Sequence, residues 1–521
     1  MLVSIVALAI GLGASWLSTR HGANLDYSDA QSHLTIARRI LESKSPGLQQ
    51  LGTVWLPAPH LLLLPLVQST WLWHTGWAAC VLGTLCLASS TASLYRIAAR
   101  IGLQRAGRLI TLVALLANPS LLYMYTTALT EPVLLAGLLG CVAGLARWAT
   151  VRRTPSGGEL AVFAGVPAAV AVLSRYEGWA LLLGGTAFVL ITGLRNGKGL
   201  GWSARAAASF VSVPSIAVLW WLAYNWGTYH NALEFMFGPY SAYAQQKNLY
   251  GSGLLPTKGN FGLALSTYDW SVLECAGAVL LGAALGGLAV LIWDNGLSDR
   301  SMIVALLAIS YSFSLASLYL GQTAIDNDHS LPANWWNSRF ALSAMPVLAL
   351  LAGILLQRWA RKKVVGLSLI AVFLVAIGMQ DAWFLQDLTG RSAVLAEARM
   401  SRQSTVGARA AGRWLAGHYH GGGILMDESA RGNAILPYIG IDLAQYDIRA
   451  SGGSFVAALA DPGAYDEWVL ANVPVANGGL DSGPNDLVEA ALAANLQTAA
   501  QYRMVFRSGD HAVYQRIGAG P

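Results

Sequence analysis

The stretch "TEPVLLAGLLGCVAGLARW", residues 130–148, decides the class of fold. Between Glu131 and Arg147 it holds only apolar and small residues, and a helix of such residues approaches the thickness of a bilayer core. The whole chain of 521 residues is 55% hydrophobic and only 12% charged. Its mean hydropathy of +0.48 is far above that of soluble domains. We therefore predict a polytopic α-helical membrane protein.

Comparable apolar runs recur along the first three quarters of the chain and predict about eleven spans. Several runs are shorter than about 18 residues, so we expect their flanks to complete the crossing, or some segments to be tilted, broken or re-entrant. The expected spans are Leu2–Trp16, Gly76–Leu94, Ile110–Tyr125, Pro132–Ala146, Leu160–Leu173, Trp179–Leu194, Ala206–Trp226, Val272–Trp293, Met302–Leu320, Ala341–Leu356 and Val364–Phe384.

Basic residues in alternate short loops predict the orientation of the chain. Placing these loops in the cytoplasm puts the N-terminus inside and everything after Phe384 outside, as expected for a multi-pass protein of the bacterial inner membrane. The first span lacks a basic n-region, so we read it as uncleaved. This topology accounts for the pI of 9.1, and nucleic acid is not an expected partner. The basic residues are Arg96, Arg100, Arg105, Arg108, Arg147, Arg152, Arg153, Arg195, Lys198, Arg205, Arg358, Arg361, Lys362 and Lys363.

Metal and disulfide chemistry have little support in the sequence. The four cysteines all fall inside expected spans, without paired spacing or nearby histidines, so we expect packing roles and no disulfide or zinc site. Asp326, Asp328 and His329 share one outer loop, where a divalent cation is conceivable. The more common interpretation of such a loop is a solvated one. No cofactor is required by the sequence, and a divalent cation stays open.

Ionisable residues gather at the outer ends of separate spans. Such residues are costly at a membrane boundary unless they are paired or snorkel, so a one-sided cluster predicts a functional site. The alternative for each member is structural: Arg175 and Glu177 can pair with each other, and Arg339 can snorkel to lipid phosphate. The set comprises Asp26, Asp29, Gln31, His33, Glu131, Arg175, Glu177 and the segment 337–339.

The stretch "YSDAQSHLTIARRIL", residues 27–41, predicts an interfacial amphipathic helix, because its apolar residues recur at spacings near three and four. Asp29 lies at the start of this helix, where the helix N-terminus favours a negative charge. Ser28 is the better N-cap by residue type, so Asp29 can also be only a first-turn charge. Asp26 lies upstream on the preceding loop.

This stretch resembles the first outer-loop signature of GT-C-type glycosyltransferases, the class that contains protein O-mannosyltransferases and the lipid A aminoarabinose transferase. Asp29 falls on the leading aspartate of that signature, and the segment 36–38 falls on its "IAR" element. The second acid of the signature is Ala30 here, and the aromatic residue is His33. A two-acid mechanism therefore does not transfer directly, and Asp26 is the alternative second acid.

Three later motifs resemble the same class in the same order. "VWLPAPHLLLLPLV" is similar to the proline-proline-leucine stretch that closes the outer loop, with Pro59 on the second proline and His60 in place of a nearby lysine. "NPSLLYMYTTALTEP" resembles an acid-bearing turn and carries Glu131, and "NSRFALSAMP" resembles a late motif that contains Arg339. The resemblance covers the membrane part, to about residue 390.

The resemblance implies a transferase that takes sugar from a polyprenyl-phosphate donor to a glycan, lipid or protein acceptor on the extracytoplasmic face. It implies an inverting displacement in which Asp29 is the base, and in which Arg339, Arg175 and His60 hold the leaving phosphate. Glu131 and His33 join the expected substrate site. The alternatives are a lipid or polysaccharide transporter or flippase, and an oligosaccharide ligase or polymerase; midplane polar groups and internal repeats, typical of transporters, are not evident.

Two further regions complete the expected organisation. The outer loop at about 227–271 is rich in aromatic and amide residues, of which Tyr243 and Lys247 could contact a sugar or its phosphate, unless the loop is an interfacial aromatic belt. Outer loops are also expected at about 18–75 and 321–340.

After a membrane domain at 1–390, the composition changes and predicts a small extracytoplasmic α/β domain at 391–521. Its expected elements are helices near Arg402–His418 and Asp486–Ala494, strands at Ile424–Asp427 and Trp468–Val473, and a closing hairpin at Tyr502–Arg516.

Overall fold

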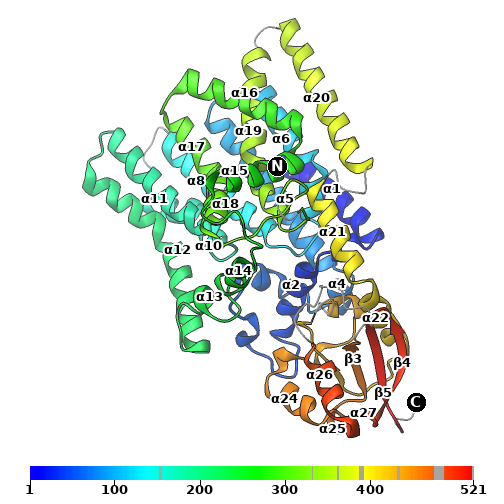
Figure 1. Ribbon diagram of the computed structural model, residues 1–521. Coiled ribbons are helices and arrows are strands. Elements are labelled where there is room, and N and C mark those ends of the chain that lie inside the picture. Colours follow the sequence, from blue (N-terminus) through cyan, green and yellow to red (C-terminus); the bar gives the residue numbers. More distant parts are fainter. Residues whose placement is uncertain are drawn as a thin grey trace.

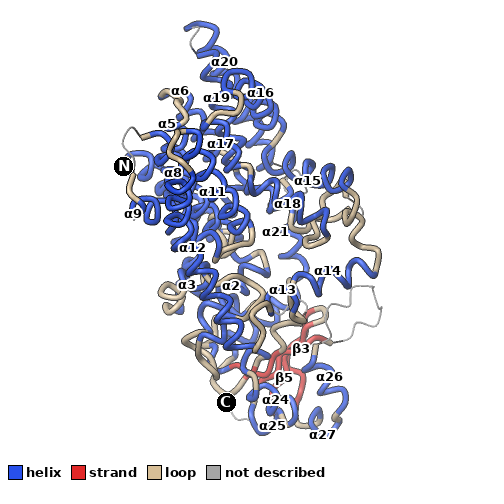
Figure 2. The backbone as a smooth tube through the Cα atoms, turned by 90° about the vertical axis from the view of Figure 1, so that its left-hand side faces the viewer, coloured by secondary structure: helices blue, strands red, loops and turns tan. Residues whose placement is uncertain are grey.

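The computed structural model describes residues 1–151, 155–330, 333–360, 363–386, 392–430, 434–473 and 486–518. A long helical part is joined at one end to a small domain that holds the strands (Figures 1 and 2). The predicted class, a polytopic helical membrane protein with a small C-terminal α/β domain, is confirmed. Four of the basic residues used to orient the chain, Arg152, Arg153, Arg361 and Lys362, lie outside the described residues.

Within the described residues, eight helical segments are long and apolar enough to cross a membrane, and a ninth span results if a bent helix pair is counted as one. The pair is α17 (Asp299–Leu307) and α18 (Ile309–Leu320), which meet at 50°. The eight segments are α1 (Leu2–Arg20), α5 (Trp77–Arg100), α8 (Glu131–Thr150), α11 (Glu177–Arg195), α12 (Leu200–Tyr229), α16 (Ala278–Asn295), a 3-10 turn (Ser338–Ala344) with α19 (Met345–Ala360), and α20 (Lys363–Gln386).

Two of the eleven expected spans are shorter, broken elements. The run expected at 110–125 divides into α6 (Arg105–Leu116) and α7 (Pro119–Met124), because Asn118 caps the second helix and Pro119 begins it. The run expected at 160–173 combines α9 (Gly157–Leu160), a π-helical turn (Ala161–Gly165) and α10 (Val166–Val172). Fewer helices are long enough to cross a membrane than the number of apolar runs in the sequence suggested.

Burial separates central from peripheral spans. In α5, α8 and the segment Ser338–Trp359, 67%, 61% and 72% of the apolar window is buried, against 22% in α1. Small residues allow neighbouring helices to approach closely: a Cβ added at Gly287 of α16 would lie 1.9 Å from the carbonyl oxygen of Leu351 in α19. The exposed face of α1 is thus available to lipid.

The first expected outer loop folds into α2 (Ser28–Arg39), α3 (Ala58–Leu63) and α4 (Thr70–His74). The predicted helix is present as α2, but its polar residues Gln31, His33 and Arg38 are buried in the protein and not solvated. Its position at a membrane interface stays a prediction. Arg38 donates to the Val67 carbonyl and to Thr70, and it pairs with Glu42, so protein groups replace the water that the sequence pattern suggested.

The second expected outer loop is also helical. It contains α13 (Glu234–Phe237), α14 (Ala242–Gly251) and α15 (Phe261–Ala276). Of these, α13 and α14 lie at the same end of the helical part as α2 (Figures 1 and 2).

The C-terminal domain is a mixed five-stranded sheet of order β2-β1-β3-β5-β4. β1 pairs in parallel with β2 and β3, whereas β5 pairs antiparallel with β3 and β4. The predicted helices, strands and closing hairpin are all present, whereas β2 and the helices α21, α23, α24, α25 and α27 were not predicted. The elements are α21 (Ala393–Ser404), α22 (Val406–His418), β1 (Ile424–Met426), α23 (Leu436–Ile439), β2 (Tyr446–Asp447), α24 (Gly453–Ala460), α25 (Pro462–Tyr465), β3 (Trp468–Asn472), α26 (Leu487–Ala494), α27 (Leu496–Ala499), β4 (Tyr502–Ser508) and β5 (His511–Arg516).

Candidate active site

Helix ends from distant parts of the chain bring charged side chains together at the end of the helical part that faces the C-terminal domain. Asp29 lies in the first turn of α2, Glu131 begins α8, and Glu177 begins α11 directly after Arg175. Arg339 lies in the 3-10 turn that precedes α19. Each acid thus lies at a helix N-terminus, where the macrodipole favours a negative charge.

Arg339 is the centre of this cluster. Its Nη2 donates to Asp29 Oδ2 at 2.6 Å, and its Nη1 donates to Glu397 Oε1 at 2.7 Å. Its Nε lies 3.4 Å from Glu131 Oε1. Because the side chain is only 7% exposed, these carboxylates replace the water that a guanidinium would otherwise hold.

Arg175 forms the second half of the cluster. It contacts Glu131 Oε1 and Glu177 Oε1, each at 3.0 Å, so Glu131 bridges the two arginines. The guanidinium of Arg175 also lies 4.2 Å from the ring centroid of Phe340, and that of Arg339 lies 5.3 Å from the same ring. Cation–π contact with one aromatic ring therefore helps to hold both cations side by side.

Exposure distinguishes Asp29 from the other acids of the cluster. The Asp29 side chain is 42% exposed, whereas those of Glu131 and Glu397 are 2% and 7% exposed. Burial raises the pKa of Glu397, against the opposing effect of Arg339. Asp29 is thus the carboxylate of the cluster that an incoming molecule can reach directly.

The backbone beside Arg339 adopts an uncommon conformation. Asn337 has φ +57°, a left-handed value that few non-glycine residues adopt. Its N–H donates to Glu397 Oε1 over 2.9 Å, and its side-chain amide donates to the Ala324 carbonyl. Glu397 therefore fixes both the guanidinium and the turn that presents it.

His33 and His60 form a buried pair in which His33 Nδ1 lies 2.8 Å from His60 Nε2. Burial, together with Arg339 and Arg175, lowers the pKa of His33 to about 3, and burial lowers that of His60 well below its usual value. Both rings are neutral at physiological pH. Their expected contact with substrate or phosphate stays a prediction, and the geometry is that of a neutral pair supporting α2 and α3.

Asp26 has partners outside the cluster. Its Oδ1 lies 3.6 Å from Arg402 and 3.8 Å from Arg409, on the two helices that begin the C-terminal domain. Burial raises its pKa to about 6, although the neighbouring arginines oppose the shift. These contacts favour a structural role over the expected catalytic one, which stays untested.

The remaining expected binding residues are exposed on α14. Tyr243 contacts the ring of Phe237, with centroids 6.1 Å apart, and Lys247 has no acidic partner among the described residues. Neither contacts the cluster in the described part of the chain. Their roles stay predictions.

In the loop where a divalent cation was considered, the residues that lie close enough to share an ion differ from those that the sequence suggested. Glu274 joins Asp328 and His329, with one atom from each within 4.8 Å of the others, whereas Asp326 pairs through its backbone with Trp336. Asp328 and His329 are exposed, and solvated groups of this kind are common without an ion.

Sequence reasoning missed Glu397, because it lies beyond the expected membrane domain. A signal was present: Glu397 is an isolated acid in the apolar helix stretch "AVLAEA", residues 393–398. Such an acid on a buried face requires a partner. Only the three-dimensional arrangement identifies that partner as Arg339.

The fold and the site together define a helical membrane domain that carries a charged cluster at one end. Among solved structures, the chain is similar to ArnT from Cupriavidus metallidurans in the apo state, at a TM-score of 0.49 and 13% identity, covering 99% of this chain and 98% of that one. It is also similar to the oligosaccharyltransferase AglB from Archaeoglobus fulgidus with an inhibitory peptide and a dolichol-phosphate, at a TM-score of 0.47 and 12% identity, covering 90% and 69%.

A further similarity is to the Archaeoglobus fulgidus oligosaccharyltransferase tethered to an acceptor peptide, at a TM-score of 0.44 and 12% identity, covering 90% and 68%. At these identities the similarity concerns the overall fold. No family model matches the chain, and no curated protein sequence matches it.

Proposed function

We propose that this protein is a membrane glycosyltransferase that moves a sugar from a polyprenyl-phosphate donor to an acceptor on the extracytoplasmic side. The observation that carries the proposal is the contact of 2.6 Å between Arg339 Nη2 and Asp29 Oδ2. It joins an exposed carboxylate to a buried guanidinium at the boundary of a membrane domain. Displacement at a sugar phosphate requires both groups, one to accept a proton and one to stabilise the leaving anion.

In the proposed reaction, the acceptor hydroxyl attacks the anomeric carbon of the donor sugar and transfers its proton to Asp29. The new carbon–oxygen bond forms as the bond to the phosphate oxygen breaks, and the phosphate leaves with that electron pair. A single displacement of this kind inverts the anomeric configuration. Asp29 presents one oxygen to Arg339, so the other is available for the acceptor.

The phosphate is proposed to compete with Asp29 for Arg339. The guanidinium already contacts three carboxylates, so an arriving phosphate replaces the most exposed of them, Asp29. Donor binding would then release Asp29 toward the acceptor, while Glu397 and Glu131 keep Arg339 in place. Arg175 lies beside the same aromatic ring and adds a second positive charge.

Lipid and glycan analysis of a deletion strain tests the proposed function. We expect one polyprenyl-phosphate sugar to accumulate and one glycosylated product to disappear, which would name the donor and the acceptor. Purified protein in lipid nanodiscs should then form that product from the accumulated lipid. Movement of the lipid between leaflets without transfer of its sugar would instead favour a flippase, and transfer of a whole oligosaccharide would favour a ligase.

A further inference from the structure

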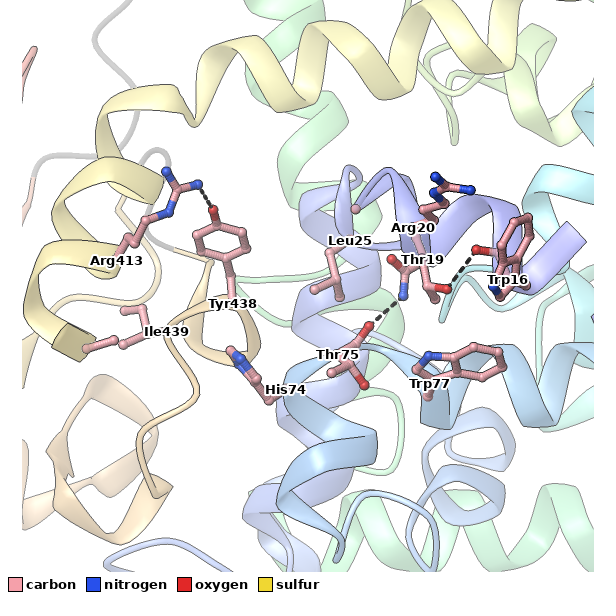
Figure 3. A pocket seen from close by; sticks show the side chains of 13 residues that line it. Trp16, Thr19, Arg20, Leu25, His74, Thr75, Trp77, Arg413, Tyr438 and Ile439 are labelled. Carbon is pink, nitrogen blue, oxygen red and sulfur yellow. Dashed lines mark hydrogen bonds between the residues drawn. The ribbon is translucent and has the colours of Figure 1, made fainter.

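A cavity of about 640 Å³ lies between the end of α1, the turn from α4 into α5, and the helices α22 and α23 of the C-terminal domain. None of the charged residues of the candidate active site lines it. Two hydrogen bonds fix its walls: the Asn24 side chain donates to the Thr75 carbonyl, and His74 Nδ1 donates to the Pro437 carbonyl, each at 2.8 Å. Figure 3 shows His74 and Thr75 among the residues that line the cavity. The cavity therefore lies where the membrane part meets the small domain, and hydrogen bonds hold its walls in place.

The cavity is lined by two arginines, Arg20 and Arg413, and by no carboxylate. Arg20 lies 5.3 Å from the ring centroid of Trp16, and Arg413 donates to the Tyr438 hydroxyl. Neither guanidinium has an acidic partner among the described residues. By contrast, Arg339 is bound by three acids. The unpaired charge of the cavity favours an anion.

The residues at and beside the cavity are of the types that gather in the lipid head-group region. α1 is long and apolar enough to span the membrane, only 22% of its apolar window is buried, and it ends at Arg20. Trp16 near that end is 55% exposed. Trp77, which begins α5 on the same side of the cavity, stacks with Trp71, which is 60% exposed. Exposed tryptophans beside arginines at a span end are typical of the head-group region.

We propose that this cavity binds the phosphate head group of an anionic glycerophospholipid on the membrane face that carries the C-terminal domain. Arg20 and Arg413 lie on opposite sides of the cavity (Figure 3), so both would attract the phosphate by their charge, and the acyl chains would lie along the exposed face of α1. Because one arginine belongs to the first span and the other to α22, the bound lipid fastens the domain to the membrane part. The exposed apolar residues of α1, among them Leu12 and Leu17, favour a lipid over a free phosphate ester.

Native mass spectrometry of the full chain, released from neutral detergent, tests the proposal with phosphatidylglycerol and phosphatidylcholine of the same acyl chains. We expect the protein to retain phosphatidylglycerol in preference. Arg20→Gln with Arg413→Gln should weaken its binding by about tenfold or more, because the two positive charges that attract the phosphate are lost. The matched control is Arg503→Gln, which removes an exposed arginine of β4 outside the cavity and should bind as the unaltered protein does.

Three results would overturn the proposal: equal retention of the two lipids by the unaltered protein, equal phosphatidylglycerol binding by the double glutamine variant, or displacement of the lipid by an equal concentration of glycerol 3-phosphate. The last result would assign the cavity to a soluble phosphate ester. Arg20→Lys with Arg413→Lys keeps both charges and should retain the lipid preference, which keeps the test valid if the glutamine variant misfolds. Since the readout is binding, its outcome is independent of glycosyl transfer.

Discussion

Arg339 Nη1 lies 2.7 Å from Glu397 Oε1, so the first helix of the C-terminal segment reaches into the charged cluster at the membrane boundary. The same carboxylate oxygen accepts from the backbone of Asn337. Glu397 therefore holds the Arg339 turn, and Arg339 in turn orients Asp29. The small domain is thereby connected to the candidate base through two consecutive ion pairs.

Glu397→Gln should lower turnover by about tenfold while the protein still folds, because an amide can accept from Asn337 but supplies no charge to Arg339. We also expect its unfolding free energy to fall by about 1–3 kcal/mol, measured by thermal unfolding in detergent. The acid control Glu489→Gln, on α26, removes a charge outside the cluster and should change neither quantity. Unchanged turnover in Glu397→Gln would separate the C-terminal segment from the reaction.

Arg339→Lys should weaken donor binding and lower turnover by about tenfold or more. Lysine keeps the charge but has no planar fork, so it cannot contact Asp29, Glu131 and Glu397 in the same way. Binding of a radiolabelled polyprenyl phosphate to nanodiscs measures the effect. If Arg339→Ala binds the donor as well as the unaltered protein does, Arg339 has no part in holding the phosphate.

The predicted orientation places residues 385–521 outside the cytoplasm. A cysteine at Arg503, exposed on β4, should react with a membrane-impermeant maleimide in intact cells. All four native cysteines are buried, so the background is low. A cysteine at Asn196, in one of the basic loops, should react only after permeabilisation. The reverse labelling pattern would show that the predicted orientation is wrong.

The C-terminal domain should lose stability as pH rises from about 4 to about 8. Burial, and secondarily Asp447, raises the pKa of Asp466 from 3.8 to about 8. The folded state therefore keeps a proton that the unfolded state releases, and this contribution is complete below the unfolded pKa and is lost as pH approaches 8. Asp466→Asn mimics the protonated acid. It should raise the unfolding midpoint at pH 8 by several degrees, which is about 1 kcal/mol or more, and have little effect at pH 4.5. Equal midpoints at pH 8 would contradict this assignment.

Features that depend on residues close together in the sequence could be predicted, whereas most features that depend on contacts between distant segments could not. Long apolar runs such as residues 132–146 predict spans because helix burial in lipid is a local requirement. The meeting of Asp29, Glu131 and Arg339 could be anticipated because each lies at a span end on one expected side. The partner of Glu397 and the burial of His60 could not be anticipated, because both depend on how distant segments pack. The burial of α2 likewise depends on neighbours that its own periodicity does not encode.

The central claim is that Asp29 is the general base, and the turnover of Asp29→Asn in lipid nanodiscs with the identified donor and acceptor tests it most directly. Asparagine keeps the size of the side chain but cannot accept the proton, so turnover should fall by about 10²-fold or more while donor binding and folding persist. Asp26→Asn is the comparison, since Asp26 pairs with Arg402 and Arg409, and it should affect stability more than turnover. Turnover of Asp29→Asn at the level of the unaltered protein would contradict the account.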